Sequence, residues 1–249
     1  MRVLITGVSS GLGAGIARAA LEAGAEVWGC SRREPPERLR AYGERLHFRA
    51  LDLSDTGSGP ERLRSWIEGI DHWDRVILNA GLLPPIADLA ETPLERLRET
   101  MEVNVWGNKW FLDTVFESGA RVDQVIGISS GASVSGSRGW NGYSVSKAAF
   151  NMLLKLYAAE RPQTHFTAFA PGLIDTAMQD YLTALPEDDR FSTLKRLKEA
   201  RGTAKMPDAE TAGSLCWEAF GRLPEKESGA FVDIRQMEPP PGEEAATGR

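Results

Sequence analysis

The chain has 249 residues, of which 42% are hydrophobic and 26% are charged, and its formal net charge is −6. This length suits one large α/β domain, and the acidic balance argues against the basic face of a nucleic-acid-binding protein. No apolar run approaches the ~20 residues of a membrane span, two cysteines are too few for a disulfide framework, and the histidines show no metal-ligand spacing. We therefore expect no metal, no nucleic acid and no membrane partner.

Short β-rich runs alternate with helix-compatible stretches from the N-terminus almost to the end. The predicted strands are residues 3–5, 27–30, 47–51, 76–78, 125–128, 166–169 and 231–232, and the clearest predicted helices are residues 12–23, 93–104 and 144–160. Most of these strands are apolar without alternation, as expected where both faces of a sheet are covered. The pattern predicts an α/β fold with a doubly wound parallel sheet.

Two segments depart from this alternation. Residues 176–206 are charged and helix-prone and lack a strand, so we expect a small helical substrate cap inserted in a single domain of residues 1–236. Residues 237–249 are rich in Pro, Gly and Glu and are predicted to be a disordered tail. Because the N-terminus enters a strand pattern at once, there is no room for a signal peptide, and we expect a cytoplasmic location.

A glycine-rich loop joins the first predicted strand to the first predicted helix. Gly7, Gly11 and Gly13 form a G-x-x-x-G-x-G pattern, which allows a tight turn, close approach of backbone to a pyrophosphate, and close helix packing. The N–H groups at the start of the helix would face the phosphates. A plain turn is the alternative. The residues of this loop assigned to a dinucleotide are Gly7, Ser9, Ser10, Gly11, Leu12 and Gly13.

The end of the second predicted strand bears on which dinucleotide is bound. A site for NAD usually has Asp or Glu there, whereas this chain has Ser31, Arg32 and Arg33. Guanidinium groups suit the 2′-phosphate of NADP(H), which arginine can bind through two hydrogen bonds. The alternative is a solvated basic turn. We expect NADP(H) as the cofactor.

Four motifs in order carry a family resemblance: the glycine loop after Thr6, Asn79-Ala80-Gly81, Tyr143-x-x-x-Lys147, and Pro171-Gly172. With them the chain resembles the short-chain dehydrogenase/reductase family from residue 2 to about residue 235. The resemblance implies a Rossmann-type fold with a seven-stranded sheet, a nicotinamide cofactor, and an enzyme acting on CH–OH or C=O groups.

The resemblance also implies roles for particular residues. Tyr143 would be the general acid/base and Lys147 its activator, Ser130 would orient the substrate carbonyl, and Asn104 would hold a proton-relay water. Further residues implied to contact the cofactor are Asp52, Leu53, Asn79, Ala80, Gly81, Tyr143, Lys147, Pro171, Gly172, Ile174 and Thr176.

Tyr143 and Lys147 are four residues apart on the predicted helix and so share one face. A free tyrosine has a pKa of about 10, and proton exchange works best near the operating pH. A nearby ammonium, helped by the oxidised nicotinamide ring, would lower the pKa of Tyr143. An exposed Tyr–Lys pair without function is the alternative, and Ser130 and Asn104 weigh against it.

The surroundings of Tyr143 resemble the sepiapterin reductase and benzil reductase branch of the family, which reduces vicinal diketones or a pterin side-chain carbonyl. In sepiapterin reductases a late aspartate binds the pterin, and Asp233 stands in the matching segment; the alternative is that Asp233 only bonds a loop backbone. Trp140 is either a pocket wall or a helix-entry anchor. Leu82, Leu83 and Phe191 add apolar material near the site. The residues assigned to the substrate are Trp140, Met178, Tyr181 and Asp233.

The predicted helix 144–160 is apolar on more than one face. One side can pack on the sheet, and the other, with Trp106, Trp110 and Phe111, could form the interface of a homodimer or homotetramer; intrachain loops are the alternative cover. We therefore expect an NADPH-dependent carbonyl reductase. A sepiapterin reductase is the alternative, and a catalytically silent NADP-binding regulator is the alternative of another class.

Overall fold

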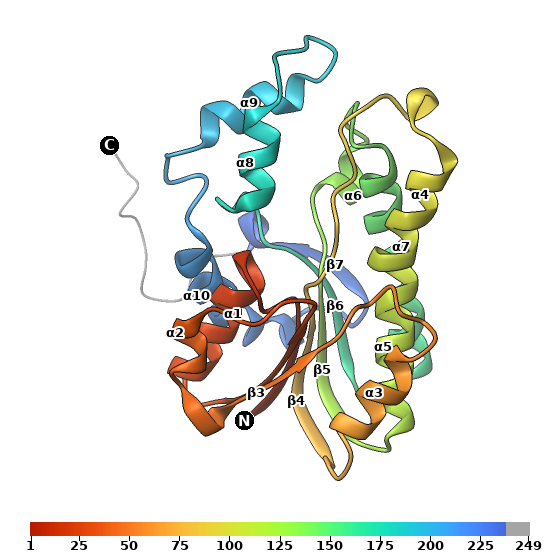
Figure 1. Ribbon diagram of the computed structural model, residues 1–249, viewed down its shortest axis with the longest axis vertical. Coiled ribbons are helices and arrows are strands. Elements are labelled where there is room, and N and C mark those ends of the chain that lie inside the picture. The colour runs from red at the N-terminus through yellow and green to blue at the C-terminus, as the bar shows by residue number, and fades with distance from the viewer. Residues whose placement is uncertain (238–249) are drawn as a thin grey trace.

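In a computed structural model, which describes residues 1–237, seven parallel strands form one sheet with helices on both faces (Figure 1). The strands are β1 Arg2–Thr6, β2 Glu26–Ser31, β3 Leu46–Ala50, β4 His72–Leu78, β5 Arg121–Ile128, β6 His165–Ala170 and β7 Ala230–Asp233. Their order across the sheet is β3-β2-β1-β4-β5-β6-β7. The doubly wound Rossmann-type fold and all seven predicted strands are confirmed.

Helices connect successive strands. They are α1 Gly11–Glu22, α2 Glu37–Arg40, α3 Gly59–Trp66, α4 Leu94–Met101, α5 Gly107–Glu117, α6 Ala132–Ser135, α7 Asn141–Glu160, α8 Ala177–Ala184, α9 Ser192–Ala200 and α10 Ala209–Phe220. A π-helix, η3 Glu102–Trp106, joins α4 to α5, and the short 3-10 helices are η1 Gly43–Arg45, η2 Leu89–Glu91, η4 Leu223–Glu225 and η5 Ile234–Gln236. None of the helices within residues 1–237 has the length and apolarity needed to cross a membrane.

The sheet has an apolar core on each face. Because side chains alternate along a strand, Val3 and Ile5 of β1 enter one core and Leu4 enters the other. The first core lies under α1 and α10, and the second lies under α3, α5 and α7 (Figure 1). Strands buried on both faces explain the continuous apolar runs in the sequence.

Helices α1 and α10 pack against each other at two glycines. A Cβ atom at Gly15 would overlap the backbone of Ala209, and one at Gly213 would overlap the backbone of Gly15. Such contact is possible only without side chains. It fixes α1, whose N-terminus follows the glycine loop.

The structure corrects the predicted helix at residues 93–104. The α-helix ends at Met101, and residues 102–106 form the π-helix η3, which leads directly into α5. A π-turn inserts an extra residue and changes the direction of the following side chains, and such turns are frequent at functional sites.

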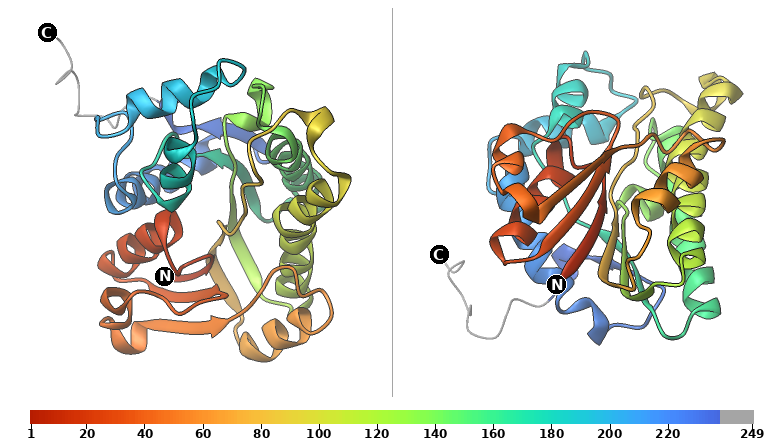
Figure 2. Two further views of the ribbon diagram at one scale, coloured as in Figure 1. Left: turned by 45° about the horizontal axis from the view of Figure 1, so that its top comes forward. Right: turned by 60° about the horizontal axis from the view of Figure 1, so that its bottom comes forward.

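The segment predicted to be a cap contains α8 and α9, and both lie beyond the end of the sheet where α1 begins (Figure 1, Figure 2). Both views in Figure 2 also place α8 and α9 at this end of the sheet. The predicted tail falls, except for Met237, outside the described residues.

Candidate active site

The glycine loop forms a cradle of backbone in which Gly7 and Gly13 have no room for a side chain. Gly7 has a φ of +82°, which side chains disfavour, and a Cβ atom there would lie 2.7 Å from Nδ2 of Asn79. A Cβ atom at Gly13 would overlap the carbonyl oxygen of Gly7. Ser10 is exposed just before α1 begins, and the first N–H groups of a helix have no partner within the helix. This cradle fits the phosphates of a dinucleotide.

Asn79 and Thr6 hold the cradle in place. The Asn79 Nδ2 group donates to the carbonyl oxygens of Thr6 at 3.0 Å and Gly7 at 3.2 Å, while the Thr6 hydroxyl accepts from the backbone N–H groups of Asn79 and Ala80. The ends of β1 and β4 are thus cross-linked by four hydrogen bonds. The role of the Thr6 hydroxyl was not foreseen from the sequence.

The basic turn after β2 is open to solvent. Arg32 and Arg33 are exposed, and neither guanidinium has an ion pair among residues 1–237. Ser31 is buried, and its hydroxyl donates to the Arg33 carbonyl oxygen at 2.7 Å, which shapes the turn. Two free guanidiniums on a fixed turn fit a phosphate group.

Other residues assigned to the cofactor follow the carboxyl ends of β3 and β6. Asp52 caps its own turn by accepting from the N–H and hydroxyl of Ser54, and Leu53 is buried. Thr176 lies next to the glycine loop, since a Cβ atom at Gly11 would be 3.4 Å from its methyl group. Gly172 has a φ of +80°, and Ile174 is buried.

Four side chains meet at the carboxyl ends of β4 and β5. Tyr143 and Lys147 come from the first turns of α7, where they are 9% and 5% exposed, Ser130 follows β5, and Asn104 lies in η3. The Ser130 hydroxyl lies beside the Tyr143 phenol, close enough to lower its pKa. The Lys147 ammonium donates to the Ile128 carbonyl oxygen at 2.6 Å.

Asn104 is fully buried and positioned by three hydrogen bonds. Its Oδ1 accepts from the Leu82 N–H at 2.8 Å, and its Nδ2 donates to the Leu82 carbonyl at 2.9 Å and the Ser146 hydroxyl at 3.0 Å. A Cβ atom at Gly81 would lie 3.1 Å from Asn104 Oδ1 and 3.6 Å from Lys147 Nζ. Gly81 therefore allows Asn104 and Lys147 to approach the same stretch of backbone.

Burial dominates the acidity of the two ionisable groups. It raises the pKa of Tyr143 above its usual value, which the neighbouring Ser130 hydroxyl offsets only in part. Burial also lowers the pKa of Lys147 to about 8. Lys147 Nζ is 5.9 Å from the centre of the tyrosine ring and bonds to a carbonyl, so the ammonium does not offset the effect of burial on Tyr143. The lowering of the Tyr143 pKa beside an oxidised nicotinamide remains a prediction.

An apolar cluster adjoins Tyr143 and includes the cap. Its buried members are Trp140, Tyr143, Leu182, Phe191, Leu194, Leu197, Ala200 and Met206, and Leu83 and Met178 pack against it. The Trp140 and Tyr143 ring centres are 5.8 Å apart. Tyr181 is 40% exposed and is not part of this cluster, where its neighbour Leu182 lies instead. The role of Tyr181 as a substrate contact remains a prediction.

Asp233 lies at the carboxyl end of β7, where it is already paired with Arg235. Its side chain is 5% exposed, and its carboxylate accepts from the Nε (2.9 Å), Nη2 and backbone N–H (3.0 Å) of Arg235. The hydrogen bond from Arg235 holds the pKa of Asp233 below its usual range. Arg235 was missed in the sequence, where the only signal is an arginine two residues after a strand-end aspartate.

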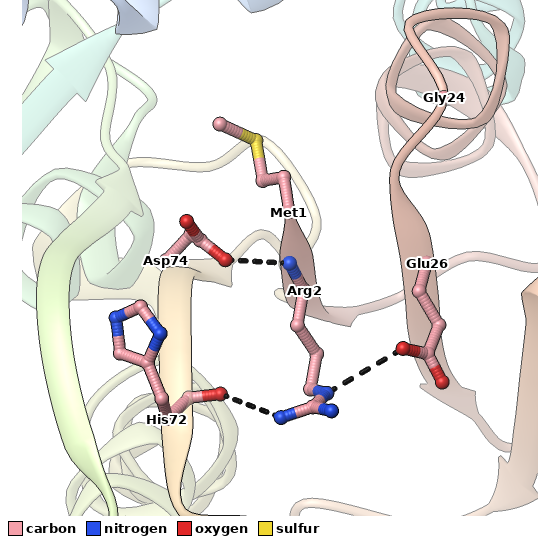
Figure 3. A pocket seen from close by; sticks show the side chains of 6 residues that line it. All are labelled: Met1, Arg2, Gly24, Glu26, His72 and Asp74. Carbon is pink, nitrogen blue, oxygen red and sulfur yellow. Dashed lines mark hydrogen bonds and ion pairs between the residues drawn. The ribbon is translucent and has the colours of Figure 1, made fainter.

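A small pocket lies at the opposite end of the sheet, away from these residues. It is lined by Met1, Arg2, Gly24, Glu26, His72 and Asp74 (Figure 3). His72, Asp74 and Asp123 have ligand-type atoms within 4.8 Å of one another, a grouping across two strands that sequence spacing did not reveal. These groups have protein partners: His72 bonds to Asp123 at 2.9 Å, and Asp74 accepts from the Arg2 N–H at 2.6 Å.

Comparison with known proteins agrees with this geometry. The family model described as short chain dehydrogenase matches residues 1–186, and the chain belongs to that family. Within the family it is similar to benzil reductases that form (S)-benzoin. The protein from Bacillus cereus is 30% identical, over 84% of this chain and 89% of the relative, and that from Bacillus subtilis is 29% identical, over 94% and 98%.

Solved structures show the same fold. The KRED1-Pglu enzyme superposes with a TM-score of 0.80 at 26% identity, covering 93% of this chain and 99% of that enzyme. A short chain dehydrogenase from Shigella flexneri, solved with NADP, has a TM-score of 0.76, and a 3-oxoacyl-[acyl-carrier protein] reductase from Brucella melitensis, solved with NAD, has one of 0.77. At 22% identity, over 94% of this chain and 96% and 94% of those chains, these last two show the fold alone.

Proposed function

We propose that the chain is an NADPH-dependent carbonyl reductase that reduces a ketone or a vicinal dicarbonyl of the benzil type, with Tyr143 as general acid. The observation that carries the proposal is the placing of the Ser130 hydroxyl beside the buried Tyr143 phenol, next to an apolar cluster and at the end of the sheet that holds the glycine loop. Two hydroxyls converging on one point can bind one carbonyl oxygen.

The chain's own residues supply binding and proton transfer. The glycine loop and the edge from Asn79 to Gly81 would hold the cofactor, which supplies the hydride when bound. Ser130 donates to the developing alkoxide, as an oxyanion-type donor does. Tyr143 gives its proton to the same oxygen, and its raised pKa keeps it protonated for that step. Lys147 provides positive charge near Tyr143. A water held by Asn104, which lies near Lys147, would relay a new proton to Tyr143 after the transfer.

The preference for NADPH rests on Arg32 and Arg33. Structures of this fold are known with either cofactor, so the fold alone does not discriminate. Two unpaired guanidiniums follow β2, and Ser31 rather than a carboxylate ends that strand, which favours a 2′-phosphate.

The substrate class rests on the cluster around Trp140 and on the relatives' activity. Aromatic and aliphatic side chains such as Phe191 and Leu182 suit an aromatic, uncharged ketone better than a sugar. For the sepiapterin alternative, Asp233 would have to exchange its bonds with Arg235 for a pterin. The diketone therefore requires less rearrangement.

Initial rates of NADPH oxidation by the purified protein, with benzil and sepiapterin in parallel, test the proposal. Benzil turnover with negligible sepiapterin turnover is the expected result. Efficient sepiapterin reduction that is lost in Asp233→Asn would establish the alternative. Tight NADPH binding without turnover of either compound, or of simple aryl ketones, would favour the catalytically silent regulator.

A further inference from the structure

The carboxyl ends of β5, β6 and β7 bring the C-terminal part of the described chain next to Ser130. Ala170, at the end of β6, is in register with Asp233 at the end of β7, and the Ser129 N–H donates to the Phe169 carbonyl at 2.7 Å. Adjacent strands are about 4.8 Å apart, so β7 lies about 10 Å from β5. A long side chain that begins just after β7 can cross this distance.

Arg235 does cross it. A Cβ atom built on Gly131 would lie 3.3 Å from Nη2 of Arg235, so the guanidinium stands beside the residue that follows Ser130. The side chain of Arg235 is 61% exposed, which leaves its remaining N–H groups accessible. The guanidinium therefore adjoins the position proposed for the substrate carbonyl.

Asp233 fixes the orientation and offsets the charge of this guanidinium. Its buried carboxylate binds both Nε and Nη2, and no hydrogen bond engages Nη1 within residues 1–237. Because the guanidinium is planar and is held on one side, its free N–H donors point in a defined direction. Because the pair is close to neutral, these donors suit an uncharged oxygen better than a second carboxylate, which Asp233 would repel.

We propose that Arg235 is a specificity-determining residue that donates a hydrogen bond to a second oxygen on the carbon next to the reacting carbonyl. The substrate class is then a vicinal dicarbonyl. This inference rests on the proposed function. Ser130 and Tyr143 bind the oxygen that is reduced, and Arg235 binds its neighbour, which selects the substrate over a mono-ketone of the same shape.

The test compares benzil with deoxybenzoin, which keeps both phenyl rings and one carbonyl but lacks the second oxygen. Wild-type protein is expected to prefer benzil. In Arg235→Met, kcat/KM for benzil should fall about 10- to 150-fold, the range of a hydrogen bond to a charged group, while that for deoxybenzoin stays within about two-fold. The quantity compared between variants is the ratio of kcat/KM for benzil to kcat/KM for deoxybenzoin.

Two further variants control for folding. Because Arg235→Met leaves Asp233 buried without its partner, Gly131→Ala provides a second approach: the backbone there has a φ of −56°, which alanine adopts, and the added methyl presses on the guanidinium. It should lower the same ratio with the ion pair retained. Arg64→Met removes an arginine of α3 that is paired with Glu61 of the same helix and with Glu117 of α5. It should leave the benzil-to-deoxybenzoin ratio of kcat/KM unchanged.

If Arg235→Met and Gly131→Ala lower kcat/KM equally for benzil and for deoxybenzoin, the assignment is overturned and Arg235 is a structural residue. A wild-type protein that reduces both compounds equally well would also overturn it, with the carbonyl reductase function intact. Failure of the wild-type protein to reduce either compound would instead count against the proposed function itself.

Discussion

Arg32 and Arg33 are the two residues on which the cofactor preference depends. A charge-assisted hydrogen bond contributes about 1.5–3 kcal/mol, so Arg32→Ala should weaken NADPH binding about 10- to 150-fold and leave NADH binding nearly unchanged. Dissociation constants of both cofactors, measured by fluorescence titration, check this. Arg38→Ala, on α2 and paired with Glu210, is a matched control. An unchanged preference would show that the turn is only solvated.

Tyr143 is the proposed proton donor, and its removal should separate chemistry from binding. Tyr143→Phe keeps the ring that packs against Trp140 but removes the phenol. We expect kcat for carbonyl reduction to fall by at least about 10²-fold, the contribution of a positioned acid, with the NADPH dissociation constant within about two-fold. Rates near those of the wild-type protein would rule out this role.

Lys147 gives a pH dependence with a definite sign. Its pKa is lowered to about 8, so it loses its proton as pH rises through that value, whereas Tyr143 keeps its proton because burial raises its pKa. The kcat/KM for reduction should therefore fall above pH about 8. A profile measured to about pH 10, with Lys147→Met expected to lack this step, checks the assignment.

Unfolding does not explain such a fall. Above pH about 8 the folded chain has released the Lys147 proton while the unfolded chain still holds it, up to the ordinary lysine pKa of about 10.4. The unfolded state then binds more protons, so this group makes stability rise with pH. Urea unfolding at both ends of the range separates the two effects.

At the scale of elements, the contact between α1 and α10 leaves no room for a side chain at Gly15 or Gly213. Gly213→Ala should push the helices apart, because the added Cβ would overlap the Gly15 backbone. Overpacking of this kind costs about 1–3 kcal/mol, which urea unfolding would measure. Gly57→Ala, whose Cβ would meet only Asp55 at an ordinary 3.6 Å, should change little. Equal stability of both variants would contradict this account.

The junction of α4 and α5 shows where local pattern fails. The amphipathic run through residues 93–104 predicts a helix, but no local preference distinguishes an α-turn from the π-turn at residues 102–106. That choice depends on Asn104 binding Leu82, 22 residues earlier, and Ser146, 42 residues later. Such bonds form only after the chain has folded.

At the scale of the whole molecule, one face of α7 is exposed to solvent within residues 1–237. Met152 and Leu156, one turn apart, are 56% and 54% exposed, and Val145 on the same stripe is 52% exposed. Trp106 is 44% exposed, but Phe111 is fully buried in the core, so its assignment to an interface is wrong. The rest of the predicted interface remains a prediction.

If that stripe is an interface between copies of the chain, charge on it should separate them. Met152→Glu with Leu156→Glu should convert an oligomer into a 27.2 kDa monomer in sedimentation velocity. Leu215→Glu, on α10 and 47% exposed, is the control and should leave the mass unchanged. A wild-type protein that already sediments as a monomer would refute the interface.

The positions of the strands along the chain, the glycine loop and the placing of Tyr143 and Lys147 on one helix face could be predicted because their signals are local: apolar runs, backbone freedom at glycine, and spacing of i and i+4 on a helix. Ser130 could be assigned only through the family resemblance. The pairing of Asp233 with Arg235, and the approach of that guanidinium to Gly131, could not be predicted. Both depend on how far apart β5 and β7 lie across the sheet and on burial, which sets the pKa of Tyr143 as well. Distance and burial are properties of the folded chain, and residues about 100 positions apart acquire them only when the sheet is complete.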